Sequence, residues 1–548
     1  MNKFRTITMY FALAVLSVAL LFGASMISRR LDASVKANHL RFTGEIKNAP
    51  VLVTFTTVAL GSFRGIVADL LWLRAGALQE KRNYFEMVQL ARWITDLQPT
   101  FSGATAYLAW NMAYNISVTC SSHAERWRWV NEGIRLIRDQ ALEYNPEDPI
   151  LYKDLAWIFQ HKLGNVLDDA NLFYKNRLAI QMMNITGSAE PSWKELAAAP
   201  ASEAEFMKKY PEEGPVWQVL NKEGFRDFEA LYNDFKSRTP AALSPALKGK
   251  MGDKLLNELT VFLRAELLRR QLKLDPDVIV EINEKYGQLD WRVPESQAIY
   301  WATMGLKRTP GHKDLSLSRL ITQSLYESFR GGRLLMVNDK DFNNIVVAPN
   351  IALVDSVYNT YSEVHKVYDG GSDYSTFRSA KINFIKEAIG ILYNFGKFTK
   401  AKEYYELLMK EENHRKREDL EQFVTAQWAE DVRDAGVKKA SEVISGLIFK
   451  SIFYLLYNDN DAALANERLA RYIYAKYSAD VGSMERMKLP SYNQMKRVVV
   501  EQCMKTFPPH LTLILKAKIA AEQAENQVEN MLKNATGVPL PTGTERKK

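Results

Sequence analysis

The chain has 548 residues, of which 47% are hydrophobic and 25% charged, a globular balance that lets most of the chain bury a core. Only 27 glycines and 19 prolines interrupt it, which favours long helices over many short strands. Two cysteines, Cys120 and Cys503, exclude a disulfide framework and a cysteine-rich metal site, and we expect both to be free thiols. The net charge of +8 is a mild excess for this length.

The first predicted element is an apolar helix at the N-terminus. Residues 6–28 carry no charged side chain, and about 20 apolar residues suffice to cross a bilayer, so we predict one transmembrane anchor over residues 1–28. The alternative is a cleaved signal peptide, since residues 23–25 are small, but two arginines follow the apolar run directly. Basic residues flank both ends, so charge orients this helix only weakly. A short basic head most often stays in the cytoplasm, which predicts that the rest is exported.

The next stretch connects this helix to the folded region. Residues 29–48 are predicted to be a linker. Residues 51–63 are again uncharged but too short to span a bilayer comfortably. We therefore expect them to form a buried first helix or a helix lying on the membrane surface.

Residues 49–185 repeat a two-helix pattern with a period of about 34 residues. After Pro99 and again after Pro146, large and small side chains recur at steps of three, one and three residues, which places them on one helical face. The first set is Tyr107, Trp110, Asn111 and Tyr114, and the second is Tyr152, Leu155, Ala156 and Phe159. A further unit downstream carries Gly396, Phe398, Ala401, Tyr405 and Leu408, in the order glycine, aromatic, alanine, aromatic and apolar residue.

These residues resemble the tetratricopeptide repeats, and in particular their membrane-anchored bacterial members. The resemblance implies a solenoid of helix hairpins whose concave face takes up a peptide or helix of a partner protein. It also implies a non-enzymatic scaffold or adaptor of an envelope assembly, secretion or transport complex, anchored in the bacterial inner membrane with its bulk in the periplasm. The candidate groove residues are Tyr107, Trp110, Asn111, Tyr114 and Phe159.

The remaining segments complete an all-α prediction. Six prolines make residues 186–252 an irregular insert of short helices. Residues 253–370 are predicted to form a middle helical region, in which two short apolar-rich runs on either side of the polar turn 338–341 predict a small β-hairpin near 333–347. Residues 371–534 resemble further repeat helices, and residues 535–548 are expected to be a disordered tail.

No motif for catalysis, a cofactor or a metal is found in the chain, so we predict a protein that is not an enzyme. Cys120 and His123 are the nearest to a reactive pair, but zinc requires further ligands. Acidic and basic residues alternate, which argues against nucleic acid as a partner, and no small-molecule substrate is evident. The alternative is an envelope hydrolase with its site in residues 186–350, because irregular inserts on scaffolds often carry function.

Two interpretations are open for the segment 289–295, which combines Trp291 with Asp290 and Arg292. It is either the start of a helix held by a local ion pair and a tryptophan anchor, or a part of the partner groove.

Overall fold

A computed structural model of the chain describes most of the sequence, in two compact units. The described residues are 13, 15–20, 22–23, 25–27, 29–30, 33–34 and 63–521, without 82, 99–100, 166, 337–345, 369–373, 413–418, 433–436 and 482–488. The first unit comprises Met1–Lys285 and Leu289–Leu325, and the second comprises Tyr286–Gln288, Tyr326–Met336 and Val346–Lys548. The described residues are overwhelmingly helical, which confirms the all-α class.

The predicted N-terminal anchor is described only in part. The described residues between 13 and 34 are helical, and their apolar side chains are exposed, among them Val18, Phe22 and Ile27 at 66%, 68% and 69%. Within the described residues, none of the helices has both the length and the apolar character needed to cross a membrane. Most of the predicted linker, the apolar stretch 51–62 and the tail at 535–548 lie outside the described residues.

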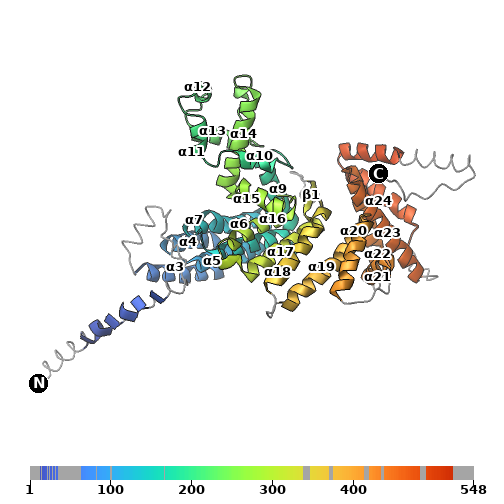
Figure 1. The fold of residues 1–548 in the computed structure, drawn as a ribbon, viewed down its shortest axis with the longest axis horizontal. Helices are drawn as coiled ribbons and strands as arrows, with labels where there is room; N and C mark the ends of the chain where they lie inside the picture. Colours follow the sequence, from blue (N-terminus) through green and yellow to red (C-terminus); the bar gives the residue numbers. More distant parts are fainter. Residues whose placement is uncertain are drawn as a thin grey trace, which may run out of the picture. The chain divides into compact units, whose positions relative to one another are not determined.

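The first unit begins with three pairs of helices. Several of these helices widen from an α-helical into a π-helical segment before they end. The first pair is α3 (Phe63–Glu80) and α4 (Tyr84–Leu97). In the second pair, the first helix is α5 (Ser102–Trp110) with η1 (Asn111–Ile116) and η2 (Ser117–Thr119), and the second helix is α6 (His123–Arg135) with η3 (Leu136–Ala141) and α7 (Leu142–Tyr144). In the third pair, the first helix is α8 (Pro149–Trp157) with η4 (Ile158–Gly164), and the second is α9 (Asn171–Thr186). Helix α4 packs on α5, α5 on α6 and α8, and α6 on α9, so consecutive pairs lie side by side (Figure 1).

Local sequence signals fix where these helices begin and how closely they approach. Asp148 caps α8 by accepting a hydrogen bond of 2.9 Å from the Ile150 amide, and Pro149 occupies the first helical turn, where its missing N–H costs nothing. A Cβ atom at Gly133 would lie 2.7 Å from the Ala109 carbonyl oxygen, so α5 and α6 meet at a position that only glycine fits. Tyr152 of the repeat pattern is buried, and so is Phe159, which was predicted to be a groove residue.

Residues 187–293 leave this stack as a small helical insert. It consists of α10 (Trp193–Ala198), α11 (Glu203–Lys209), α12 (Pro215–Lys222), α13 (Phe228–Ser237), η5 (Pro245–Leu247), α14 (Asp253–Leu267) with η6 (Leu268–Leu272), and α15 (Pro276–Tyr286). Its core is aromatic: the Phe206 and Phe262 rings stack at 4.3 Å, and Phe228 lies 5.7 Å from Phe262. The short helices agree with the prolines of this segment.

The stack of helix pairs resumes after the insert. Helix α16 (Pro294–Leu306) packs along α8, with the Trp301 and Tyr152 rings 6.2 Å apart. A Cβ atom at Gly305 would lie 2.8 Å from the Tyr152 Cβ atom, so this contact is again closed by a glycine. The short turn η7 (Pro310–His312) leads to α17 (Leu315–Gly331), within which the division between the two units falls.

The second unit contains a small β-ladder and a series of helices. Strands β1 (Arg333–Met336) and β2 (Val346–Ala348) pair antiparallel with Arg333 opposite Ala348, at the place of the predicted hairpin; its turn lies outside the described residues. The helices are η9 (Ile351–Leu353), α18 (Val354–Val367), α19 (Tyr374–Asn394), α20 (Phe398–Glu411), α21 (Leu420–Val432), α22 (Val437–Leu456), α23 (Asn460–Val481) and α24 (Tyr492–Thr506), and residues 509–521 are also helical.

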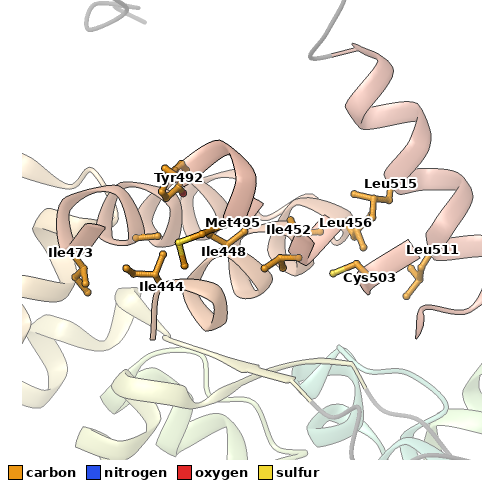
Figure 2. Close-up of a cluster of buried hydrophobic side chains, with 12 residues drawn as sticks. Ile444, Ile448, Ile452, Leu456, Ile473, Tyr492, Met495, Cys503, Leu511 and Leu515 are labelled. Atoms are coloured by element: carbon orange, nitrogen blue, oxygen red, sulfur yellow. The ribbon is translucent and has the colours of Figure 1, made fainter. Parts of the chain in front are cut away.

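The core of the C-terminal helices follows from the four-residue spacing of apolar side chains on α22. Figure 2 shows Ile444, Ile448, Ile452 and Leu456 along this helix, beside residues of α24 and the final helix. Cys503 is fully buried among them, and burial raises the pKa of its thiol to about 11, so it acts as a small apolar side chain. Both cysteines are free thiols, as predicted.

Candidate functional site

A row of partly exposed aromatic side chains crosses the first helices of the three N-terminal pairs. We call it the aromatic row; it consists of Trp72, Tyr107, Trp110, Tyr114, His161 and Trp157. Successive ring centroids lie 5.4 Å (Trp72–Tyr107), 6.3 Å (Tyr107–Trp110), 5.5 Å (Trp110–Tyr114), 5.7 Å (Tyr114–His161) and 4.6 Å (His161–Trp157) apart. Tyr107, Trp110 and Trp157 are 48%, 42% and 39% exposed, which is unusual for contiguous large rings.

Helical spacing brings these rings to the surface together. On α5 the exposed positions Gly103, Tyr107 and Trp110 are four and three residues apart, so they form one stripe, while the positions between them are buried. Trp157 at the end of α8 and His161 on η4, which continues it, form a similar stripe. Because α5 packs beside α8, the two stripes face the same groove.

A hollow of about 250 Å³ opens between these two stripes. It exists because two of its α5 positions are small: glycine and alanine stand where larger side chains would fill the space between the helices. Its lining residues are Gly103, Ala106, Tyr107, Trp110, Asp154, Trp157 and Ile158. Three aromatic rings and one carboxylate therefore surround a space smaller than the ~300 Å³ at which drug-sized ligand pockets begin.

Asp154 supplies the charge of this hollow. Burial raises the pKa of the Asp154 carboxyl above its usual range. The nearby Lys153 lowers this pKa, but by less than burial raises it. The Lys153 ammonium lies 3.6 Å from the carboxylate on a side chain that is 39% exposed, so solvent screens much of this pair. The carboxylate is thus partly desolvated and weakly compensated.

A buried ionic cluster supports the far end of the aromatic row. The Asp168 carboxylate lies 2.5 Å from the Lys162 ammonium and 3.7 Å from the Arg126 guanidinium, and it also accepts a 2.9 Å hydrogen bond from the Ala170 amide. This cluster fixes the loop between η4 and α9. The Lys162 ammonium in turn lies 5.4 Å from the centre of the Tyr114 ring, a cation–π contact that holds this ring in place.

The two aromatic side chains that titrate at this end, His161 and Tyr114, are uncharged at neutral pH. Burial, and then the nearby Lys162, lower the pKa of His161 below its usual value, so its imidazole is neutral. Burial, and then Asp168, raise the pKa of Tyr114, and its buried hydroxyl has no hydrogen-bond partner among the described residues.

The structure divides the five groove residues predicted from the sequence into two groups. Tyr107, Trp110 and Tyr114 belong to the aromatic row, where a partner can contact the first two. Asn111 and Phe159 are each only 1% exposed. Asn111 donates a 3.1 Å hydrogen bond to the Tyr107 carbonyl and accepts one of 2.6 Å from Asn115, so its amide braces the helix from within and lines no groove.

Four residues of this surface, Trp72, Asp154, Trp157 and His161, were not predicted from the sequence. The repeat pattern directs attention to positions that carry helix packing, whereas these residues occupy the exposed stripe. A signal was present, since Asp154, Trp157 and His161 are three and four residues apart on one helix. That this stripe faces the one on α5 depends on how the two helices pack.

A second hollow lies in the insert, between α10, α11 and α14. Its volume is about 280 Å³, with Phe206 and Phe262 among its lining and Lys209, Tyr210 and Glu258 at its polar side. Glu258 accepts hydrogen bonds from Tyr210 and, at 2.8 Å, from Lys209, and these bonds lower the pKa of its carboxyl. The described residues that line it include no serine, cysteine or histidine.

Two other sequence features have structural roles. The Asp290 and Arg292 side chains pair at 2.8 Å, and the buried Trp291 indole donates a 3.1 Å hydrogen bond to Asn283, so this segment holds the start of α16. His123 lies in the first turn of α6, next to the half-buried Cys120. Among the described residues, no group of three or more His, Cys, Asp or Glu side chains is arranged to hold a metal ion.

Comparison of the chain with protein-family models, with curated proteins and with solved structures gives no match.

Proposed function

We propose that this protein is a membrane-tethered, non-enzymatic scaffold that binds a partner protein along the aromatic row. The observation that carries the proposal is the exposure of contiguous rings: Tyr107, Trp110 and Trp157 lie on neighbouring helices with 39–48% of their surface accessible. Large aromatic side chains dominate the binding energy of protein interfaces, because they bury much area at a small cost in conformational entropy.

The helix pairs supply a rigid support for this surface. The rings stand on α5 and α8, whose opposite faces are buried, and Asn111, Phe159 and the Asp168 cluster fix them from below. Stacked helix pairs present extended surfaces of this kind, and the resemblance to tetratricopeptide repeats supports the same assignment.

The membrane tether is proposed from the uncharged segment 6–28, which is long enough to span a bilayer as a helix. The described residues of this segment are helical and expose apolar side chains, which supports an apolar surrounding. On this proposal the N-terminal helix holds the protein in the bacterial inner membrane and the aromatic row faces the periplasm.

Replacement of Trp110 by alanine tests the proposal. Removal of a ring at the centre of an interface costs on the order of 2 kcal/mol or more, which weakens binding about thirtyfold. We therefore expect that the full chain, purified from its native membranes in mild detergent, brings a stoichiometric partner with it, and that Trp110→Ala loses this partner. Mass spectrometry of the purified material measures both.

The matched control is Trp93→Ala. Trp93 is a 48% exposed tryptophan on α4, outside the aromatic row, so its removal should leave the partner bound. Equal recovery of the partner with Trp110→Ala and with the wild type would contradict the proposed binding surface, and purification of the wild type alone would contradict the scaffold.

A further inference from the structure

We propose that the hollow between α5 and α8 binds the guanidinium group of an arginine side chain presented by the partner protein. The inference rests on the proposed function and specifies the chemistry that the aromatic row recognises. It is carried by the composition of the hollow, whose lining combines the aromatic residues Tyr107, Trp110 and Trp157 with the acidic residue Asp154.

The rings favour a cation. The face of an aromatic ring carries partial negative charge, and a cation within about 6 Å of it is attracted, most strongly by tryptophan. Two of the three rings here are tryptophans. A guanidinium group is planar and weakly hydrated, so it stacks on such rings at a lower desolvation cost than an ammonium group does.

The carboxylate excludes the other classes of side chain. An apolar side chain in the hollow would bury Asp154 without compensation, and a buried unpaired charge is costly. An acidic side chain would be repelled by it. An arginine both pairs with the carboxylate and stacks on the rings, and it competes only with the exposed and screened Lys153.

The size and surroundings of the hollow favour a side chain of a protein. Its volume of about 250 Å³ suits one long side chain. The aromatic row continues on both sides, to Trp72 on α3 and, through Tyr114, to His161, so residues next to the arginine find further rings to contact at Trp72 and His161. A lipid headgroup of the choline type shares the cationic chemistry but would leave these flanking rings unused.

Fluorine NMR of the full chain in mild detergent tests the proposal. The protein is labelled with 5-fluorotryptophan, and the resonances of Trp110 and Trp157 are assigned by single Trp→Phe substitutions. The probes are acetyl-arginine methylamide, acetyl-citrulline methylamide, which has the same shape without the charge, and glycerophosphocholine. We expect arginine to shift both resonances saturably and citrulline to leave them in place.

Two variants test separately whether arginine binding needs the Asp154 carboxylate and whether it needs the empty volume of the hollow. Asp154→Asn should weaken arginine binding about fivefold, the contribution expected from one partly desolvated ion pair, while the attraction to the rings remains. Gly103→Leu should abolish the shifts by filling the hollow; a Cβ atom at this position meets its nearest neighbour at 3.8 Å, so the helix accommodates the substitution. The control is Asp480→Asn, because Asp480 pairs with Lys476 at the same 3.6 Å that separates Asp154 from Lys153.

Each contrary result has a definite meaning. Equal shifts with citrulline, no shift with arginine, or unchanged affinity in Asp154→Asn would overturn the proposal, and a stronger response to glycerophosphocholine would assign the hollow to a lipid headgroup instead. If the native partner is lost with Trp110→Ala but retained with Asp154→Asn, the scaffold stands and the arginine site is wrong.

Discussion

Asp154 shows how a single residue can be unfavourable for folding and still suit a binding site. Its carboxylate is half-buried beside three aromatic rings, and the pKa of the group is raised mainly by burial. Such a shift means that the folded state binds a proton more tightly than the unfolded state does. The ionised carboxylate therefore lowers the stability of the folded chain at neutral pH, a cost that a bound cation would offset.

We therefore predict that Asp154→Asn stabilises the folded protein, and that the gain in stability depends on pH. At pH 7 the substitution removes an unfavourable charge, so the midpoint of urea unfolding should rise slightly. As the pH falls below the unfolded-state pKa of about 3.9, Asp154 is protonated in both states and the gain should vanish. Unfolding curves of both proteins at neutral pH and near pH 3 measure this difference, and a loss of stability at pH 7 would contradict it.

The environment of Asn111 could not be predicted from the sequence. Its position in the repeat pattern allowed either a contact with a partner peptide or a contact between helices, because the spacing of Trp110, Asn111 and Tyr114 is the same for both. Burial decides between them: the amide is enclosed and bonds to its own helix. Phe159 is buried for the same reason, since its helix has neighbours on two sides.

At the scale of single elements, local signals were readable from the chain. Short apolar runs on either side of a polar turn located the strands at Arg333–Met336 and Val346–Ala348, and the prolines of residues 186–252 accounted for the short helices there. The π-helical ends of α5, α6 and α8 were not foreseen. A π-helical turn depends on how its widened backbone packs against neighbouring helices, and the composition of these segments does not indicate it.

Helix α24 offers a test of how much one local signal contributes. Ser491 accepts a hydrogen bond from the Gln494 amide, and the Gln494 side chain accepts one of 2.9 Å from the Ser491 amide, which forms a capping box. Ser491→Ala should cost about 1 kcal/mol and increase amide hydrogen exchange in the first turns of α24. Ser478→Ala, on the exposed surface of α23, is the control and should leave exchange there unchanged. Equal exchange in both variants would refute a stabilising role for the cap.

At the scale of the whole molecule, the chain divides into two compact units, each with buried apolar side chains. The core of the second unit contains Ile444, Ile448 and Ile452 of α22, whereas Phe159 and Tyr152 lie in the core of the first. In stacked helical proteins each pair of helices contacts mainly its neighbours, so stability is a sum of local terms. Damage to one core should therefore be detected mainly in its own unit.

Two truncations of buried side chains test this independence. Ile448→Ala should cost about 2–5 kcal/mol, and Phe159→Ala about 3–5 kcal/mol, through lost contacts and the cavity that remains. Hydrogen exchange followed by mass spectrometry should show the loss of protection in α22–α24 for the first variant and in α5–α9 for the second. Loss of protection spread evenly over both units would mean that the chain unfolds as one cooperative body.

The sequence by itself determined the helical class, the short helices of the proline-rich insert, the strand pair and the two free thiols, because these follow from the spacing of apolar residues, from prolines and from composition. It could not determine which aromatic side chains of a helix are buried by another helix, because that helix is distant in the chain. The hollow is the clearest case: Gly103 and Tyr107 come from one helix, Asp154 and Trp157 from another, and only the packing of α5 against α8 makes them one site.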